Sequence, residues 1–187
     1  MIAVYVIIGI VVVGIFVLIA MYNSLVGLRN QVRNAWAQID VQLKRRHDLI
    51  PNLVETVRGY MTHERETLEA VTNARNLAQR AVGTGVEAQA KAEGELSSAL
   101  SRLLAVVENY PNLKANQNFL ALQEELTATE NRVGFSRQYY NDSVLRYNNK
   151  IQMFPSNIMA NMAGFKQEQF FQVSAAEELE APRVSFR

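Results

Sequence analysis

The chain begins with an apolar run from Ile2 to Tyr22, in which 21 consecutive residues carry no charge. As an α-helix rising about 1.5 Å per residue, this run extends roughly 31 Å, the thickness of a bilayer's hydrocarbon core. A cleaved signal peptide is the alternative, but it needs an early basic residue, a shorter apolar stretch and a small-residue cleavage site. The first basic residue is Arg29, and Leu18-Ile19-Ala20 is a poor cleavage site. The pattern therefore predicts an uncleaved transmembrane anchor over residues 1–22.

Beyond the anchor, apolar or compact residues recur at steps of three and four, the spacing of one buried helix face. They are Leu25, Leu28, Val32, Ala35, Ile39, Leu43, Ile50, Leu53, Val57 and Tyr60. Arg46 is the one polar interruption, and Pro51 lies on this face without changing its phase. Proline costs a helix about 3 kcal/mol, which continuous packing can offset. We expect one helix reaching about Arg58 and bent near Pro51, with a reversal at Pro51 as the alternative to one near Gly59.

Three further helices are predicted, over residues 63–82, 87–109 and 113–153. Gly59 is expected to end the first helix as a left-handed cap, and Thr62 to cap the next one. The sequences around Gly83–Gly85 and Tyr110–Asn112 predict turns. The residues expected to face inward are Leu68, Val71, Arg75, Ala78, Val82, Leu96, Leu100, Leu103, Val107, Phe119, Leu122, Leu126, Thr129, Val133, Tyr140, Val144, Tyr147, Ile151 and Phe154.

The predicted helix lengths nearly close an up-down-up-down path at about 1.5 Å per residue. The expected fold is therefore all-α. It comprises a transmembrane helix continuous with an antiparallel up-and-down four-helix bundle over residues 23–154, whose last helix has a spacing close to a coiled coil. An extended C-terminal tail follows over residues 155–187.

Charge next to the anchor predicts the orientation of the chain. Residues 29–46 carry five basic side chains and one acidic side chain, Asp40. By the positive-inside rule the N-terminus lies outside and the bundle lies in the cytoplasm. The net charge of +1 and the lack of a clustered basic face exclude nucleic acid as an expected partner. The absence of cysteine is compatible with a reducing compartment.

The basic residues near the membrane differ in what they are expected to contact. Arg29 and Arg33 are close enough to the anchor to meet lipid headgroups. The triplet Lys44-Arg45-Arg46 would start about 33 Å along the helix from Tyr22, well beyond a Debye length. We therefore expect the triplet to form either a solvated face or an internal ion pair rather than a lipid site.

Signals for catalysis, metals and cofactors are weak, and we predict none of the three, nor a small-molecule substrate. His63-Glu64 begins an H-E-x-x-H pattern, but Thr67 stands where the second histidine is needed to share a zinc ion. Gly83-Thr84-Gly85 lacks the G-K-[ST] ending of a phosphate loop. The pair Asn148-Asn149 predicts polar helix surface, although a buried asparagine can fix the register of a bundle.

The tail carries more aromatic residues than an unstructured segment usually has, so something is expected to bury them. The candidate contact residues are Phe165, Phe170, Phe171, Val184 and Phe186. Three receptors remain open: the chain's own bundle, a neighbouring subunit, or the headgroup layer or a separate protein.

Three segments, Tyr22–Val71, Tyr110–Val133 and Tyr147–Phe165, resemble the LemA family of bacterial membrane proteins. The resemblance implies a single-pass protein of a bacterial inner membrane, with an antiparallel four-helix bundle and no known catalytic residues. It also implies a link to membrane proteases of the HtpX kind in some members, and to magnetosome membrane formation in one relative.

Our leading hypothesis is a non-catalytic membrane-tethered scaffold that self-associates as a homo-oligomer and organises envelope proteins or membrane. The alternative is an adaptor for a membrane protease or transporter that docks through its C-terminal tail. A third hypothesis is an unrecognised hydrolase that depends on His47, His63 or a carboxylate.

Overall fold

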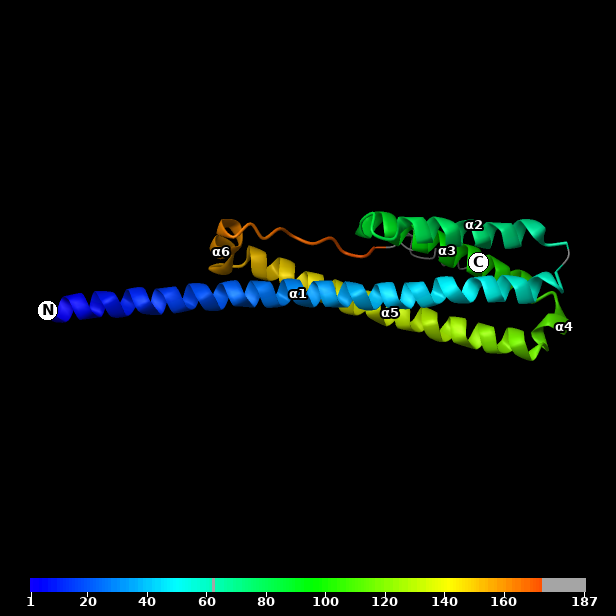
Figure 1. The fold of residues 1–187 in the computed structure, drawn as a ribbon, viewed down its shortest axis with the longest axis horizontal. Coiled ribbons are helices and arrows are strands. Elements are labelled where there is room, and N and C mark those ends of the chain that lie inside the picture. Colours follow the sequence, from blue (N-terminus) through cyan, green and yellow to red (C-terminus); the bar gives the residue numbers. More distant parts are fainter. Residues whose placement is uncertain (62, 173–187) are drawn as a thin grey trace, which may run out of the picture. The chain divides into compact units, whose positions relative to one another are not determined.

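The computed structural model describes residues 1–61 and 63–172, and every regular element among them is an α-helix. In chain order (Figure 1) the helices are α1 (Ile2–Arg58), α2 (Arg65–Ala81), α3 (Val86–Val107), α4 (Pro111–Lys114), α5 (Gln117–Gln152) and α6 (Ser156–Met162). No strand occurs in the described ranges. The prediction of an all-helical chain with a long apolar N-terminal helix is therefore confirmed.

The first helix, α1, runs without interruption through the apolar run to Arg58 and contains Pro51. Within the described residues it is the one helix that is long and apolar enough to cross a membrane, and none of its apolar window is buried. The core helix of a soluble domain would instead be mostly covered by its neighbours. Because α1 continues through Pro51 to Arg58, the chain reverses after Arg58 and not at Pro51.

The expected left-handed cap at Gly59 is wrong. Positive φ angles occur at other glycines, namely Gly83, Gly85 and Gly164. The turn is closed by backbone hydrogen bonds, because the amides of Tyr60 and Met61 each donate to the carbonyl of Val57 at 3.0 Å. The Val57 carbonyl, one of the orphan acceptors at a helix end, is satisfied without any left-handed residue.

Contacts divide the chain into two compact units. The first unit comprises residues 1–40 and 135–169, and the second comprises residues 41–134 together with 170–172 of the described tail. Both α1 and α5 contribute residues to each unit. The predicted boundaries at residues 22 and 154 separate the anchor, the bundle and the tail, which is a different division from the two units. These boundaries stay predictions.

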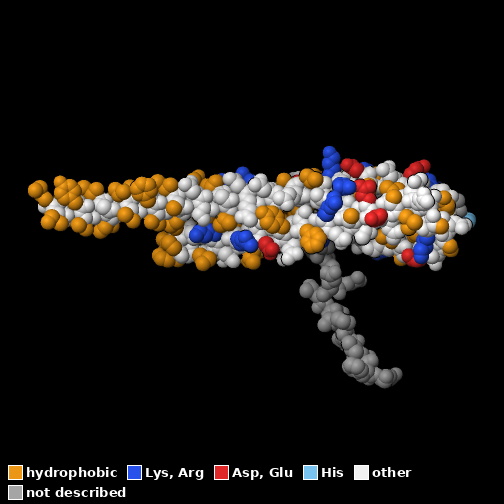
Figure 2. Space-filling view, turned by 90° about the horizontal axis from the view of Figure 1, so that it is seen from below, with side chains coloured by type: hydrophobic (Ala, Val, Ile, Leu, Met, Phe, Trp, Pro, Cys, Tyr) orange, Lys and Arg blue, Asp and Glu red, His pale blue; other side chains and the backbone are white. Residues whose placement is uncertain are grey.

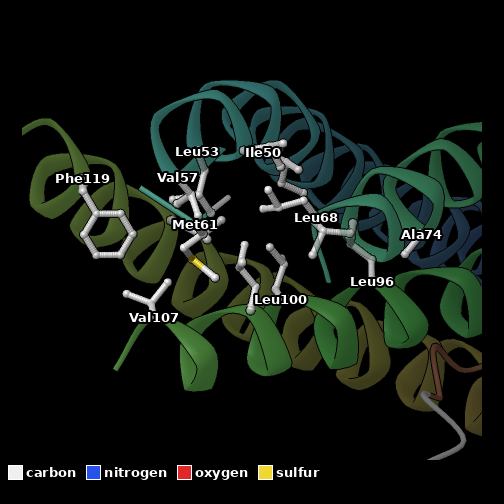
Figure 3. Close-up of a cluster of buried hydrophobic side chains, with 14 of the residues drawn as sticks. Ile50, Leu53, Val57, Met61, Leu68, Ala74, Leu96, Leu100, Val107 and Phe119 are labelled. Carbon is white, nitrogen blue, oxygen red and sulfur yellow. The ribbon is translucent and has the colours of Figure 1, made fainter. Parts of the chain in front are cut away.

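The second unit has one hydrophobic core, built from α1, α2, α3 and α5 together with Met61 and Leu113 (Figure 3). Most of the residues expected to face inward from these helices are buried, which confirms the periodicity. They include Ile50, Leu53, Val57, Leu68, Val71, Leu96, Leu100, Leu103, Val107, Phe119 and Leu126. Burial of such side chains contributes about 1.5–3 kcal/mol each, so this core holds the four helical segments together.

Three residues expected to face inward are exposed instead. They are Tyr60, Val82 and Phe154, and each lies just beyond the end of its helix. A spacing of three and four keeps a residue on the buried face only while the chain remains helical. The periodic pattern therefore predicts burial one turn too far at these helix ends.

Some element boundaries also differ from the prediction. The second helix begins at Arg65 with Glu64 as its N-cap, so Thr62 is not the cap residue, and Thr62 itself lies outside the described residues. The turn at Tyr110–Asn112 includes the start of α4. Asn116 precedes α5, and its Oδ1 accepts the amide of Phe119 at 3.1 Å, as an N-cap does.

In the first unit, α1 packs against the later part of α5. The buried residues on α1 are Leu25, Val32, Ala35 and Ile39, and those on α5 are Tyr140, Val144, Tyr147 and Ile151. The rings of Trp36 and Tyr140 meet edge-on with centroids 5.2 Å apart. Trp36 thus belongs to the helix interface, where an edge-on aromatic pair adds to area burial.

Candidate functional site

The chain leaves α6 through a turn that sends the following residues out as an extended segment. Gly164 has a φ of +70°, a conformation that glycine adopts readily and other residues avoid. The amide of Phe165 donates to the carbonyl of Ala160 at 2.9 Å, and that of Gly164 to Asn161 at 3.3 Å. These two bonds form a Schellman motif, which ends the helix and sets the exit direction. We call residues 165–169 the strap.

Phe165 fixes the start of the strap against α1. Its ring is buried and meets the ring of Tyr22 edge-on, with centroids 5.9 Å apart. The guanidinium carbon of Arg29 lies 5.0 Å from the same ring centroid, within cation–π range. Tyr22 ends the apolar run and Arg29 is the first charged residue of the chain. Phe165 therefore lies beside the stretch of α1 where the sequence changes from apolar to charged.

The end of the strap is held by hydrogen bonds from α5 to its main chain. Nδ2 of Asn148 donates to the carbonyl of Glu168 at 2.9 Å, and Oδ1 of Asn148 accepts the Glu168 amide at 2.9 Å. The hydroxyl of Tyr140 donates to the carbonyl of Gln169 at 2.9 Å. An extended segment has no internal backbone bonds, so these three bonds supply partners that secondary structure would otherwise provide.

Tyr140 and Tyr147, which are both buried on α5, have raised pKa values. Burial, with a smaller contribution from the carboxylate of Glu168, raises the pKa of Tyr140 to about 12. Burial and Glu168 also raise the pKa of Tyr147, while the nearby Arg29 and Arg33 act in the opposite direction. Tyr140 therefore stays protonated at neutral pH and remains a hydrogen-bond donor to the strap.

The predicted residues near the membrane lie as follows. Ile2 is the first residue of α1, and Tyr22 packs on Phe165. Arg29 is half-buried over Phe165, whereas Arg33 is exposed. Contact of Arg29 or Arg33 with lipid headgroups stays a prediction. The structure brings Tyr22, Arg29 and Phe165 together, although the sequence pattern predicts separate roles for them.

The remaining tail residues are described in part. Phe170 is partly exposed and Phe171 is buried. Val184 and Phe186 lie outside the described residues. Over residues 165–169 the structure places the tail on its own chain, which is one of the three receptors left open by the sequence.

Asn148 and Tyr140 are the site residues whose role the sequence did not reveal. Asn148 was expected on the polar surface or as a register residue, and it is buried on the side of α5 that holds the strap. Tyr140 was expected in the core, and its ring is buried while its hydroxyl reaches the strap. One signal in the sequence could have indicated the role of Asn148, because this asparagine lies next to Tyr147 on an otherwise apolar face. Periodicity alone does not show what a polar residue on such a face binds.

A second polar site lies within the core of the second unit, centred on Arg46. The Arg46 side chain is 1% exposed, and its Nη2 contacts the carboxylate of Glu93. Its Nη1 donates to Oγ of Ser97 at 2.9 Å and to Oε1 of Glu130 at 2.9 Å. We call Arg46, His47, Glu93, Ser97 and Glu130 the Arg46 cluster. The cluster connects α1 with α3 and α5.

The basic triplet divides between the two roles that the sequence left open. Arg46 forms the internal ion pair, which explains how a charged residue can interrupt the apolar face without exposing it. Arg45 is on the solvated side and pairs with Glu125 at 2.7 Å, and Lys44 is exposed.

His47 is neutral in this cluster. Its pKa is lowered to about 4 by burial and by the charges of Arg46 and Arg75, against an opposing effect of Asp48. Its Nε2 lies 2.9 Å from Oε1 of Glu93. The neutral ring therefore carries its proton on Nε2 and donates a hydrogen bond to the carboxylate. Ser97 bonds to Arg46. Within the described residues, no group of histidine and acidic side chains is arranged to hold a metal ion.

The LemA family model matches residues 35–186, which is most of the chain. The chain belongs to the LemA family. Protein LemA of Metamycoplasma hominis is 25% identical over 172 residues, which cover 92% of this chain and 78% of that protein. Magnetosome protein MamQ 2 of Paramagnetospirillum magneticum is 26% identical over 190 residues, covering 89% of this chain and 70% of that protein. MamQ of Magnetospirillum gryphiswaldense is 24% identical, with 82% and 65% covered.

This LemA-family chain is a helical protein whose N-terminal apolar helix indicates membrane anchoring. The family model begins at residue 35 and therefore does not itself cover the anchor. The anchor rests on the exposed apolar window of α1. The strap lies next to the end of that window, through the contact of Phe165 with Tyr22.

Proposed function

We propose that the protein is a non-catalytic, membrane-tethered helical scaffold that self-associates and organises envelope proteins or membrane. The observation that carries the proposal is the strap, which Asn148 and Tyr140 hold through its main chain. Main-chain recognition places few demands on sequence, so Asn148 and Tyr140 can hold the strap of a neighbouring copy in the same way. Such an exchange would link chains without any new surface.

The arrangement behind this proposal is an antiparallel four-helix bundle. It is supported in the second unit by a core that four helices share. In the first unit it is supported by the order of contacts, because Trp36 meets Tyr140 while Arg29 influences Tyr147. Contacts that run in opposite sequence order are typical of antiparallel neighbours in a bundle.

The proposed location is a bacterial inner membrane, with the N-terminus outside and the bundle in the cytoplasm. It is supported by the excess of basic residues over residues 29–46. The relatives named as magnetosome proteins support a role at a membrane. A single cysteine introduced at exposed Lys44 should react with a membrane-impermeant maleimide only after cells are opened.

Self-association is favoured by the tether itself. Confinement to a membrane raises the effective concentration of neighbouring chains, so weak contacts are enough to form a cluster. The full-length protein extracted in mild detergent should therefore show a mass above that of a monomer, rising with protein concentration in light scattering. A strictly monomeric particle at every concentration would refute the scaffold.

The alternative function is an adaptor that docks a membrane protease or transporter through its tail. The strap favours this alternative as well, since side chains that bind main-chain groups can hold a partner's extended segment. Deletion of residues 165–187 should then abolish co-purification with the partner while the helical circular dichroism signal is kept. Under the scaffold proposal the same deletion lowers the number of chains in each particle.

A hydrolase remains the third hypothesis, and the geometry gives it little support. His47 is buried and bonded to Glu93, and the nearby Ser97 bonds to Arg46. A general base must reach the proton it removes, and a covered imidazole offers substrate no approach. Hydrolase activity that disappears on replacing His47 or His63 would overturn the non-catalytic proposal.

A further inference from the structure

The end of α5, the following turn and α6 expose a group of large apolar side chains. Its members are Met153, Phe154, Ile158 and Met162, which we call the apolar tip. Phe154 is 79% exposed and Met162 is 77% exposed. Single exposed apolar residues are common on proteins, but four within ten residues at one end of a helical unit need a partner.

The apolar tip lies beside the point where α1 leaves the apolar run. Phe165 lies three residues after the end of α6 and packs on Tyr22, the last residue of that run. From Tyr140, which meets Trp36, α5 continues for 12 residues to Gln152, or about 18 Å. An equal distance back along α1 from Trp36 reaches the turn of helix that follows Tyr22. Figure 1 shows α6 next to this part of α1.

The charges around the apolar tip are of one sign. Between Ser143 and Gln167 the sequence contains no aspartate or glutamate, and its charged residues are Arg146, Lys150 and Lys166. Figure 2 shows hydrophobic side chains gathered beside the apolar run of α1, with basic side chains next to them. Apolar residues flanked by basic ones are the composition of a surface that enters the headgroup region of an anionic bilayer.

We propose that the apolar tip inserts into the interface of the same bilayer that α1 crosses. The first unit is then held at two points, by the transmembrane helix and by the tip, with Phe165 between them. A bilayer is the occupant that the position selects, because the tip is continuous with the end of the membrane-spanning run. This inference stands whether or not the chain self-associates.

The test uses the full-length chain with a single tryptophan at the apolar tip. In the double variant W36F/F154W, the phenylalanine that replaces Trp36 keeps an aromatic ring against Tyr140. The matched control is W36F/F135W, because Phe135 is also on α5, is 73% exposed, and lies about 25 Å along the helix from its end. Both proteins are reconstituted into phosphatidylethanolamine–phosphatidylglycerol vesicles, with and without lipids brominated on the acyl chains.

We expect brominated lipid to quench F154W fluorescence at least threefold more than F135W fluorescence, with a blue-shifted emission at position 154. Equal quenching at the two positions would overturn the proposal. A blue shift at position 154 without quenching would also overturn it, since a second copy of the chain rather than lipid would then cover the tip.

A second measurement guards against a variant that fails to fold. The sequence has no cysteine, so M162C and the control F135C each carry one nitroxide label. Reconstituted M162C should be more accessible to membrane-soluble oxygen than to a water-soluble nickel complex, and F135C should show the reverse. Greater accessibility to nickel at position 162 would contradict insertion.

Discussion

The side chain of Asn148 forms two hydrogen bonds with the main chain of Glu168, one as donor and one as acceptor, both at 2.9 Å. An amide side chain paired in this way satisfies both backbone groups of a residue in an extended segment. The adjacent Asn149 is exposed. The two asparagines are identical in chemistry and next to each other in sequence, so they form a matched pair for testing the strap.

Replacing Asn148 by alanine should release the strap. The substitution leaves the Glu168 amide and carbonyl without their partner, which costs about 1–3 kcal/mol and raises the open population by a factor of about 5 to 160. Lys166 is exposed within the strap. We therefore expect trypsin to cut after Lys166 faster in N148A than in the wild type, as measured by mass spectrometry. Asn149→Ala is the control, and equal cleavage rates in the two variants would contradict the role of Asn148.

Replacing Gly164 by alanine should weaken the same segment through backbone strain. Its φ of +70° disfavours a residue with a Cβ, while nothing lies within 4 Å of that Cβ, so the cost is conformational and about 1 kcal/mol. Gly134 is in the interior of α5, also with open space around its Cβ. There alanine should stabilise the helix by about 0.5–1 kcal/mol. Thermal unfolding in detergent should shift in opposite directions for G164A and G134A, and a shift of the same sign would refute this explanation.

The Arg46 cluster should respond to substitution far more than its exposed neighbour does. Arg46→Met leaves the buried carboxylate of Glu93 without its guanidinium, which typically costs about 3–5 kcal/mol. Arg45→Met removes an exposed pair with Glu125 and should cost less than about 1 kcal/mol. Urea unfolding followed by circular dichroism compares the two.

The double variant R46M/E93Q tests whether the buried charge is the cause. It removes the carboxylate charge but keeps an oxygen that can accept the proton of His47. We expect it to recover a large part of the stability lost in R46M. A double variant no more stable than R46M would show that packing around Arg46, rather than charge, dominates.

The stability of the protein should fall as the pH is lowered from 6.5 towards 4 because of His47. Its pKa is lowered in the folded chain from 6.5 to about 4, so the unfolded chain binds a proton in this window and the folded chain does not. The loss is at most on the order of 3 kcal/mol across the window. Glu93, Arg46, Arg75 and Asp48 are the charged groups that face or influence this ring.

Two histidine variants isolate this contribution. His47→Gln can still donate to Glu93 but does not titrate, so its melting temperature should depend less on pH than that of the wild type. His63 is exposed and serves as the control, and H63Q should follow the wild-type profile. A pH dependence unchanged in H47Q would contradict the buried neutral histidine.

Local pattern predicted much of this fold. The unbroken apolar run and the three-and-four spacing of apolar residues depend on helix geometry, which every helix shares. For that reason α1 could be predicted through Pro51 to Arg58, and the buried faces of α3 and α5 agree closely with expectation. Helix ends were predicted less well. Caps depend on the path of the neighbouring chain, as at Gly59, where backbone bonds replace the expected left-handed residue.

The sequence by itself determined an all-helical chain, its apolar N-terminal helix and its family, because these depend on composition, spacing and motif. The tertiary structure decided that Arg46 is buried while Arg45 is solvated, and that Asn148 rather than Asn149 holds the strap. Helical spacing places Arg46 and Asn148 on apolar faces, but a polar side chain is buried there only where a partner distant in the sequence satisfies it. Glu93 is the partner of Arg46, and Glu168 is the partner of Asn148. Only folding brings the two residues of each pair into contact.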